Sequence, residues 1–216
     1  MLSGNQLGRK LKSLEGIPEH FAIRLHRAIS WLKAAEANDK DPDVCYVTLW
    51  IAFNACYASD LSAEDVLTER ERFRAFIGKL TGHDGERRIF NLLWNKYSGP
   101  VHSLLQNQYL FRNFWDYHRG QATEWEHAFQ RTVTEAHQYL ARQDVPALLE
   151  IVLDRLYTLR NQVVHGGATY KSKLNRQQLR DGIRMLQFLV PVVLDIMMEN
   201  NAEDWGPIFY PVIKDT

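Results

Sequence analysis

An arginine, an asparagine and a histidine lie close together near the end of a long apolar helix pattern, in the stretch LRNQVVHGG, residues 159–167. On a helical wheel with Leu149 at zero, Arg160 falls at about 20°, inside the apolar face. Asn161 and His165 fall at about 120° and 160°, together on one flank. A guanidinium on an apolar face is costly unless it is paired or opens onto a wet cleft. Arg160 therefore either has a carboxylate partner or faces a site.

A purely structural role stays open for each of these three residues. Arg160 can form an ion pair inside a bundle. A histidine in the last turn of a helix interacts favourably with the helix dipole and with free carbonyl groups. Asn161 and His165, four residues apart, can simply contact each other. Each residue alone is weak evidence for a site, and the hypothesis depends on their combination.

Basic residues concentrate around the same stretch, although the whole chain has no net charge. Residues 154–184 carry an excess of five positive charges, because only Asp154 and Asp181 oppose Arg155, Arg160, Lys171, Lys173, Arg176, Arg180 and Arg184. Such a concentration is either a solvated face or a rim that attracts phosphate beside an arginine and a histidine. The candidates for that rim are Lys171, Lys173, Arg176 and Arg180.

The elements that must position these residues have helical periodicity, and no segment alternates as a strand does. We expect long helices over about residues 18–37, 43–58, 123–142, 144–165 and 175–199. Four N-terminal caps are expected, at Ser62, at Thr123 in a capping box, at Asp144 and at Asn175. The sequence therefore predicts an all-α bundle of four to five long helices.

Residues 80–120 depart from this regular pattern, because they are rich in aromatic residues and interrupted by glycine and proline. We interpret them as an irregular helical insertion packed onto the bundle, within a single domain that spans residues 1–216. The segment NFWDYHRG, residues 113–120, could stack a base, although a packed insertion is the simpler interpretation.

Several classes of site and location are not expected. Cys45 and Cys56 would lie about 16 Å apart on one helix, too far for a disulfide, which fits a reducing compartment. We find no zinc-ligand spacing and no phosphate-binding glycine loop, so no metal or cofactor is expected. The N-terminal residues lack the apolar stretch of a signal peptide, and the longest apolar run is too short to span a bilayer. We therefore expect a cytoplasmic protein without a membrane partner.

The motif RNQVVH, residues 160–165, resembles the R-x4-6-H motif of the HEPN superfamily. Its placement is also similar, at a helix end that is followed by a loop and a last long apolar helix. The apolar segment WIAFNACYA, residues 50–58, resembles the central helix of Apea-like bacterial HEPN proteins. The resemblance extends over about residues 140–199 and 17–60, and it implies an HEPN-like helical bundle.

HEPN membership implies a metal-independent endoribonuclease, in a toxin–antitoxin, abortive-infection or other defence role. It also implies a homodimer, in which two motifs face one cleft, and an antitoxin or other protein partner. Arg160 would hold the scissile phosphate, His165 would act as general base or acid, and Asn161 would orient His165 or the phosphate. The substrate would be RNA, and the RNA-binding residues would be Lys171, Lys173, Arg176 and Arg180.

Two alternatives to an enzyme remain. One is a non-catalytic HEPN domain that binds a nucleotide, RNA or a protein partner. The other is a structural helical adaptor, which requires Arg160 to be held in an ion pair and His165 to face bulk water. Some HEPN toxins carry a tyrosine two residues after the histidine that a partner enzyme modifies. Here Gly167 occupies that position, so this form of control is not expected.

Overall fold

The computed structural model of the chain describes residues 2–58, 69–96, 98–173, 176–208 and 210–213. Within these ranges every regular element is a helix and no strand occurs, so the predicted all-α class is confirmed. None of the helices in the described ranges is long and apolar enough to cross a membrane. In chain order the elements are α1 (Gly4–Lys12), α2 (Glu19–Ala37), α3 (Pro42–Tyr57), α4 (Glu69–Gly82), α5 (Arg88–Phe90), the π-helical turn η1 (Asn91–Lys96), α6 (Ser98–Leu105), the 3₁₀ turn η2 (Gln108–Leu110), α7 (Arg112–His118), α8 (Glu126–Arg142), α9 (Val145–Val164) and α10 (Arg176–Glu199).

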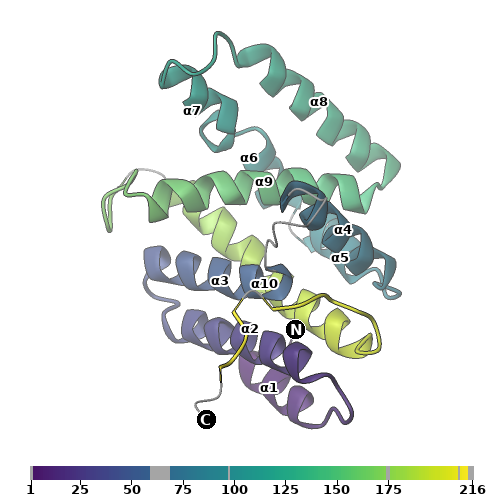
Figure 1. Cartoon of the computed structure of the whole chain (residues 1–216). Helices are drawn as coiled ribbons and strands as arrows, with labels where there is room; N and C mark the ends of the chain where they lie inside the picture. The colour runs from purple at the N-terminus through teal and green to yellow at the C-terminus, as the bar shows by residue number, and fades with distance from the viewer. Residues whose placement is uncertain (1, 59–68, 97, 174–175, 209, 214–216) are drawn as a thin grey trace.

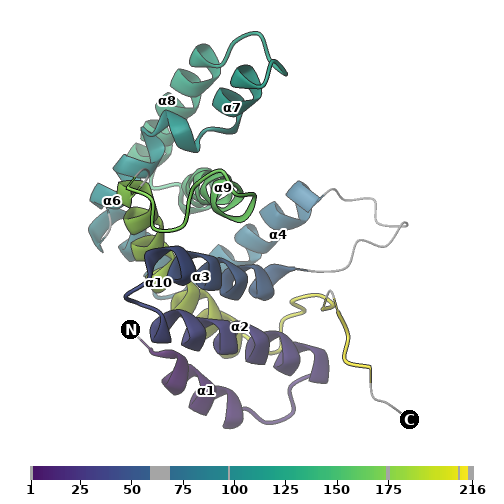
Figure 2. The same cartoon turned by 90° about the vertical axis from the view of Figure 1, so that its left-hand side faces the viewer.

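The main core lies where α2, α3, α9 and α10 pack against one another (Figures 1 and 2). As predicted from its periodicity, α2 buries one apolar stripe, formed by Phe21, Leu25, Ile29 and Leu32. The apolar stripe of α10 is buried in the same way, at Leu179, Leu186, Val190, Val193 and Met197. Burial of these side chains removes apolar surface from water and stabilises the bundle.

Close packing fixes α9, the helix that carries the RNQVVH motif. Gly182 of α10 sits so near that an added Cβ would lie 2.8 Å from the Tyr46 ring and 3.0 Å from Leu159. The hydroxyl of Tyr46 on α3 donates a hydrogen bond of 2.6 Å to the carbonyl of Leu156. Only a glycine lets α10 approach α3 and α9 this closely, and the position of α9 is therefore set from both sides.

The ends of α9 follow the predicted signals. Asp144 is the N-cap, and its carboxylate accepts a 3.1 Å hydrogen bond from the backbone N–H of Ala147. His165 is the C-cap, and Gly166 follows with a φ of +72°, a left-handed conformation that glycine adopts without strain. The helix therefore stops at the histidine of the motif, which turns the chain into the following loop.

The expected insertion over residues 80–120 divides into two parts with different packing. Side chains of α5, η1 and α6 are buried in the main core, namely Ile89, Leu92, Leu93, Val101, Leu104 and Leu105. Leu110 of η2 is also buried in this core, whereas residues from Phe111 onward lead into a hairpin of α7 and α8 that stands on the other side of α9 (Figure 1). This hairpin has its own small cluster of Phe111, Phe114 and Phe129.

The expected N-terminal caps and the two cysteines can be compared with the structure. The capping box at Thr123 does not form, because α8 begins at Glu126 with Trp125 at its N-cap and without a side-chain cap. The expected caps at Ser62 and Asn175 fall outside the described residues. Cys45 and Cys56 are both free and buried, as expected, and burial raises their thiol pKa values to about 11 and about 12.

Candidate functional site

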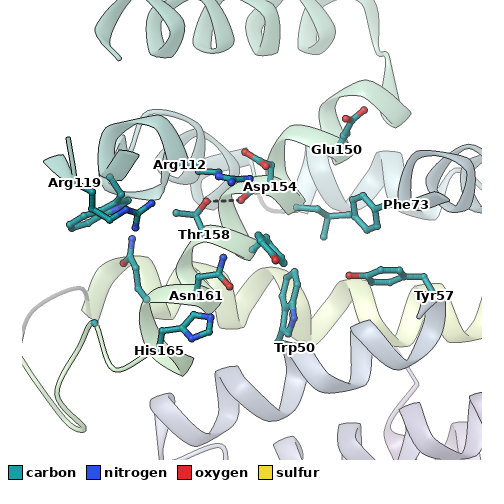
Figure 3. A pocket seen from close by; sticks show the side chains of 15 residues that line it. Trp50, Tyr57, Phe73, Arg112, Arg119, Glu150, Asp154, Thr158, Asn161 and His165 are labelled. Atoms are coloured by element: carbon teal, nitrogen blue, oxygen red, sulfur yellow. Dashed lines mark hydrogen bonds between the residues drawn. The ribbon is translucent and has the colours of Figure 1, made fainter. Parts of the chain in front are cut away.

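A cleft of about 720 Å³ lies along α9, with α3 and α4 on one side and α7 on the other (Figure 3). This volume is within the range of about 300–1,000 Å³ that is usual for small-molecule sites. Aromatic, cationic, anionic and amide side chains all reach it. The lining residues are Trp50, Tyr57, Phe73, Arg112, Trp115, Arg119, Glu150, Leu153, Asp154, Tyr157, Thr158, Asn161, Gln162, His165 and Gly167.

The predicted motif meets the cleft at one end. Asn161 and His165 both line it, as their shared flank of the helix requires. Arg160 is not among the lining residues, but its Nη1 donates a 2.9 Å hydrogen bond to Oδ1 of Asn161. Because that bond uses Oδ1, the Nδ2 group of Asn161 can donate to a ligand oxygen. The structure thus bonds the side chains of Arg160 and Asn161 to each other and brings Asn161 and His165 to the same cleft.

Arg160 is half-buried rather than enclosed in the core. Within the described part of the chain no carboxylate lies at ion-pairing distance from its guanidinium, which lies 6.0 Å from the centre of the Tyr157 ring. The sequence left two possibilities for Arg160, a carboxylate partner or a position facing a site. Among the described residues it has no carboxylate partner. His165 is exposed, and its backbone N–H donates to the carbonyl of Asn161 at 3.0 Å.

The enclosed arginine of α9 is Arg155, which has no exposed surface. Its guanidinium carbon lies 4.7 Å from the ring centre of Phe111 and 5.6 Å from that of Phe129, beneath the α7–α8 hairpin. No side-chain nitrogen of Arg155 has a hydrogen-bond partner among the described residues, and the Asp154 carboxylate is 3.9 Å away. Burial lowers the pKa of Arg155 to about 10. Cation–π contacts offset part of this cost.

Aromatic side chains from three helices form one wall of the cleft. The Trp50 ring of α3 meets the Tyr157 ring of α9 edge-on, with ring centres 5.9 Å apart. Tyr57 and Phe73 form a second edge-on pair, with ring centres 4.9 Å apart. Tyr157 keeps 40% of its surface exposed, so part of this wall is open to a ligand.

The opposite wall comes from α7 and carries positive charge. Arg112 and Arg119 share a single carboxylate, that of Asp116, at 3.7 Å and 2.5 Å. The side chain of Trp115 is fixed by a 2.8 Å hydrogen bond from its Nε1 to the carbonyl of Tyr109. Gln162 of α9 also donates to this carbonyl, at 2.5 Å, and so ties the two walls together.

The two ends of the cleft differ in chemistry (Figure 3). His165, Asn161 and Arg119 lie toward one end, whereas Phe73 and Glu150 lie toward the other. The Glu150 carboxylate accepts a 2.6 Å ion-paired hydrogen bond from Arg74. His165, Asn161 and Arg119 therefore provide nitrogen donors at the motif end. Arg112 lies beside Asp154, and Glu150 and Phe73 lie farther along the cleft.

The four residues of the predicted rim do not line the cleft, and we call them the rim from here on: Lys171, Lys173, Arg176 and Arg180. Arg176 forms a two-pronged ion pair with Asp43, at 2.7 Å and 3.1 Å. Lys171 lies 3.7 Å from the Asp41 carboxylate, and Arg180 donates to Gln177 at 2.9 Å. Lys173 is exposed.

Several cleft residues were not predicted as site residues, among them Arg112, Arg119, Trp50 and Tyr157. The available signal was the segment 113–120, which mixes aromatic and charged groups and supplies Trp115 and Arg119 to the cleft. Its Phe114, by contrast, is buried in the hairpin cluster. The packed interpretation therefore holds for Phe114, whereas base stacking by this segment stays a prediction.

Among the described residues, no group of three or more His, Cys, Asp or Glu side chains is arranged to hold a metal ion. No protein-family model, curated protein or solved structure matches the chain. Any proposal about its family or function therefore depends on the residues and the geometry described above.

Proposed function

We propose that the protein is an HEPN-type endoribonuclease that cleaves RNA without a metal ion, through Arg160, Asn161 and His165. The observation that carries this proposal is the arrangement of three side chains at the end of α9. Asn161 and His165 line the cleft, and Asn161 is bonded to an arginine that lacks a carboxylate partner among the described residues. A guanidinium kept out of ion pairs is suited to bind a phosphate oxygen.

Cleavage requires a base, an acid and stabilisation of charge on phosphorus. In one orientation His165 takes the proton of the ribose 2′-hydroxyl, and the 2′-oxygen then attacks phosphorus. The bond to the 5′-oxygen breaks, and this oxygen must receive a proton as it leaves. Arg160 and the Nδ2 group of Asn161 donate to the phosphate oxygens, on which negative charge grows. The products are a 2′,3′-cyclic phosphate and a 5′-hydroxyl.

A separate proton donor is needed for the leaving oxygen in this scheme, because one side chain cannot act as base and acid in the same step. A homodimer with two motifs at one cleft would supply the partner's copy of His165. Exposed apolar and aromatic side chains surround the end of α9 and support such contacts: Tyr109, Val164 and Tyr170. The defence role and an antitoxin or other protein partner are proposed on the HEPN resemblance alone, and the cytoplasmic location is proposed on the sequence features given above.

The alternative is an HEPN domain that binds RNA or a nucleotide without cleaving it. The volume and mixed lining of the cleft favour ligand binding whether or not chemistry follows. The two proposals differ only in whether His165 transfers a proton.

The test of catalysis is RNA cleavage by the purified protein in EDTA, compared with two histidine variants. We expect His165→Ala to lower the cleavage rate by about 10²- to 10⁴-fold, the usual contribution of general acid–base catalysis, with little change in thermal midpoint. His127→Ala is the matched control, since His127 is exposed on α8 outside the cleft, and it should cleave like wild type. A fully active His165→Ala would refute the proposed mechanism, and a folded wild-type protein inactive on all RNAs would favour the binding alternative.

A further inference from the structure

We propose that the cleft holds one unpaired nucleotide of single-stranded RNA. Its base lies against the aromatic wall at Tyr157 and Trp50, and its phosphate lies toward His165 and Arg119. This nucleotide site rests on the proposed function in one respect, namely that the phosphate is the one on which Arg160 and His165 act. Binding of the base itself depends only on the cleft.

The aromatic wall supplies a surface for stacking. Tyr157 lines the cleft and is 40% exposed, and its ring contacts Trp50 and lies near the Arg160 guanidinium. Farther along, the Tyr57 and Phe73 rings extend the same apolar surface. Bases of every type stack on aromatic side chains, and stacking is the common way in which proteins hold unpaired bases. A base inside a duplex has its faces covered by its neighbours, so the wall selects single strands.

The charged side chains of the cleft indicate which end holds the phosphate of the nucleotide and which end holds the base. Glu150 and Asp154 line the cleft beyond the motif and would repel a phosphate placed beside them. Arg119 and His165 lie toward the motif end, where a phosphate finds nitrogen donors. Carboxylates can instead accept hydrogen bonds from the exocyclic amino groups of bases. The phosphate therefore belongs at the motif end and the base beyond it.

Other ligand classes use fewer of these groups. A wholly apolar molecule would leave Arg112, Arg119 and His165 without a role. A free phosphate or a sulfate ion would leave the aromatic wall without one. A nucleotide within a strand uses both, and it places its phosphate next to the Arg160–Asn161 pair.

The experiment measures binding of a short fluorescent oligonucleotide made wholly of 2′-deoxy residues, which lacks the 2′-hydroxyl needed for cleavage. A second oligonucleotide has the same length and phosphates but abasic sites in place of its bases. We expect the wild-type protein to bind the base-containing strand about tenfold or more tightly than the abasic strand, by fluorescence anisotropy. Equal affinity for the two strands would overturn the nucleotide site, even if the protein cleaves RNA.

Substitutions of Tyr157 in the aromatic wall test whether the preference for the base-containing strand arises there. Tyr157→Ala should weaken binding of the base-containing strand about tenfold and leave binding of the abasic strand unchanged. Tyr157→Leu, which keeps an apolar side chain against Trp50, should give the same result if the ring is needed for stacking. Tyr117→Ala is the matched control, because Tyr117 is also 40% exposed but does not line the cleft. A base preference that survives both Tyr157 variants would overturn the site.

The binding result and the cleavage result are separable. A protein that binds bases through Tyr157 but never cleaves RNA would retain the nucleotide site and lose the proposed enzymatic function. A protein that cleaves RNA in EDTA but binds both strands equally would retain the function and lose the site.

Discussion

Basic residues gather in two places around the end of α9, and the structure uses them differently. The rim is dense in the sequence, but Arg176 is engaged by both oxygens of the Asp43 carboxylate and Lys171 lies near Asp41. The α7 wall of the cleft holds only Arg112 and Arg119, which share one carboxylate and face the aromatic wall. The two arginines of the α7 wall therefore meet a ligand in the cleft directly. The rim does not line the cleft, although Lys173 and Arg180 have no carboxylate partner among the described residues.

Counting the charged residues in one stretch of sequence therefore does not give the electrostatic potential at a binding site, because carboxylates from distant parts of the chain neutralise some of them. Asp43 lies 133 residues before Arg176, so a window around the motif cannot include it. An ion pair whose two side chains are 21% and 12% exposed is largely neutralised and leaves little charge for a ligand, and removal of one partner would leave the other as an uncompensated charge. Through Lys171 and Arg176 the rim thus holds the loop after α9 and the first turn of α10 against the start of α3.

The largest effect expected from this comparison is on stability. Arg176→Ala removes the partner of a mostly buried carboxylate, and we expect the free energy of unfolding to fall by about 2–4 kcal/mol in denaturant titrations. The exposed Arg180 is the control, and Arg180→Ala should cost less than about 0.5 kcal/mol. RNA cleavage below the unfolding transition should persist in Arg176→Ala. Loss of cleavage with full stability would instead place Arg176 in the substrate site.

A smaller effect is expected on oligonucleotide binding when two basic residues are replaced by glutamine, either in the α7 wall or in the rim. Arg112→Gln with Arg119→Gln should weaken binding of the 2′-deoxy oligonucleotide about tenfold and reduce the salt slope by about 0.7 for each phosphate that is no longer neutralised. Lys171→Gln with Lys173→Gln, which removes the same formal charge, should change affinity about twofold or less. Anisotropy titrations at several salt concentrations measure both quantities. A larger loss of affinity from the lysine pair would reverse the assignment of the two regions.

Helices and their ends were predictable because their signals are local. Apolar residues repeat along α2 and α10 at helical spacing, and Asp144 and Gly166 mark the two ends of α9. The placement of Asn161 and His165 together follows from helical geometry alone, and the cleft confirms that they share a flank. The failed cap at Thr123 shows the limit of such signals, because α8 begins at Glu126 and the preceding Trp125 packs against the hairpin cluster.

The cleft itself was not predictable, because it exists only where separate helices meet. Nothing in the sequence near Trp50 or Phe73 indicates that α3 and α4 will stand opposite α7. For the same reason the sequence did not show which of the two arginines of α9, Arg155 or Arg160, would be enclosed. A helical wheel placed Arg160 on the apolar face, but the enclosed residue is Arg155, since the α7–α8 hairpin covers it with Phe111 and Phe129.

Arg160→Ala tests most directly whether the end of α9 is a site for chemistry. Cleavage rate in EDTA and free energy of unfolding are measured on the same preparation, beside wild type. Because no described carboxylate pairs with Arg160, we expect the free energy of unfolding to change by less than about 1 kcal/mol. Cleavage should fall by about 10²- to 10³-fold, as when a donor to the transition state is removed. A variant that cleaves RNA at the wild-type rate, or one destabilised by about 3–5 kcal/mol as for a broken buried pair, would contradict a catalytic Arg160.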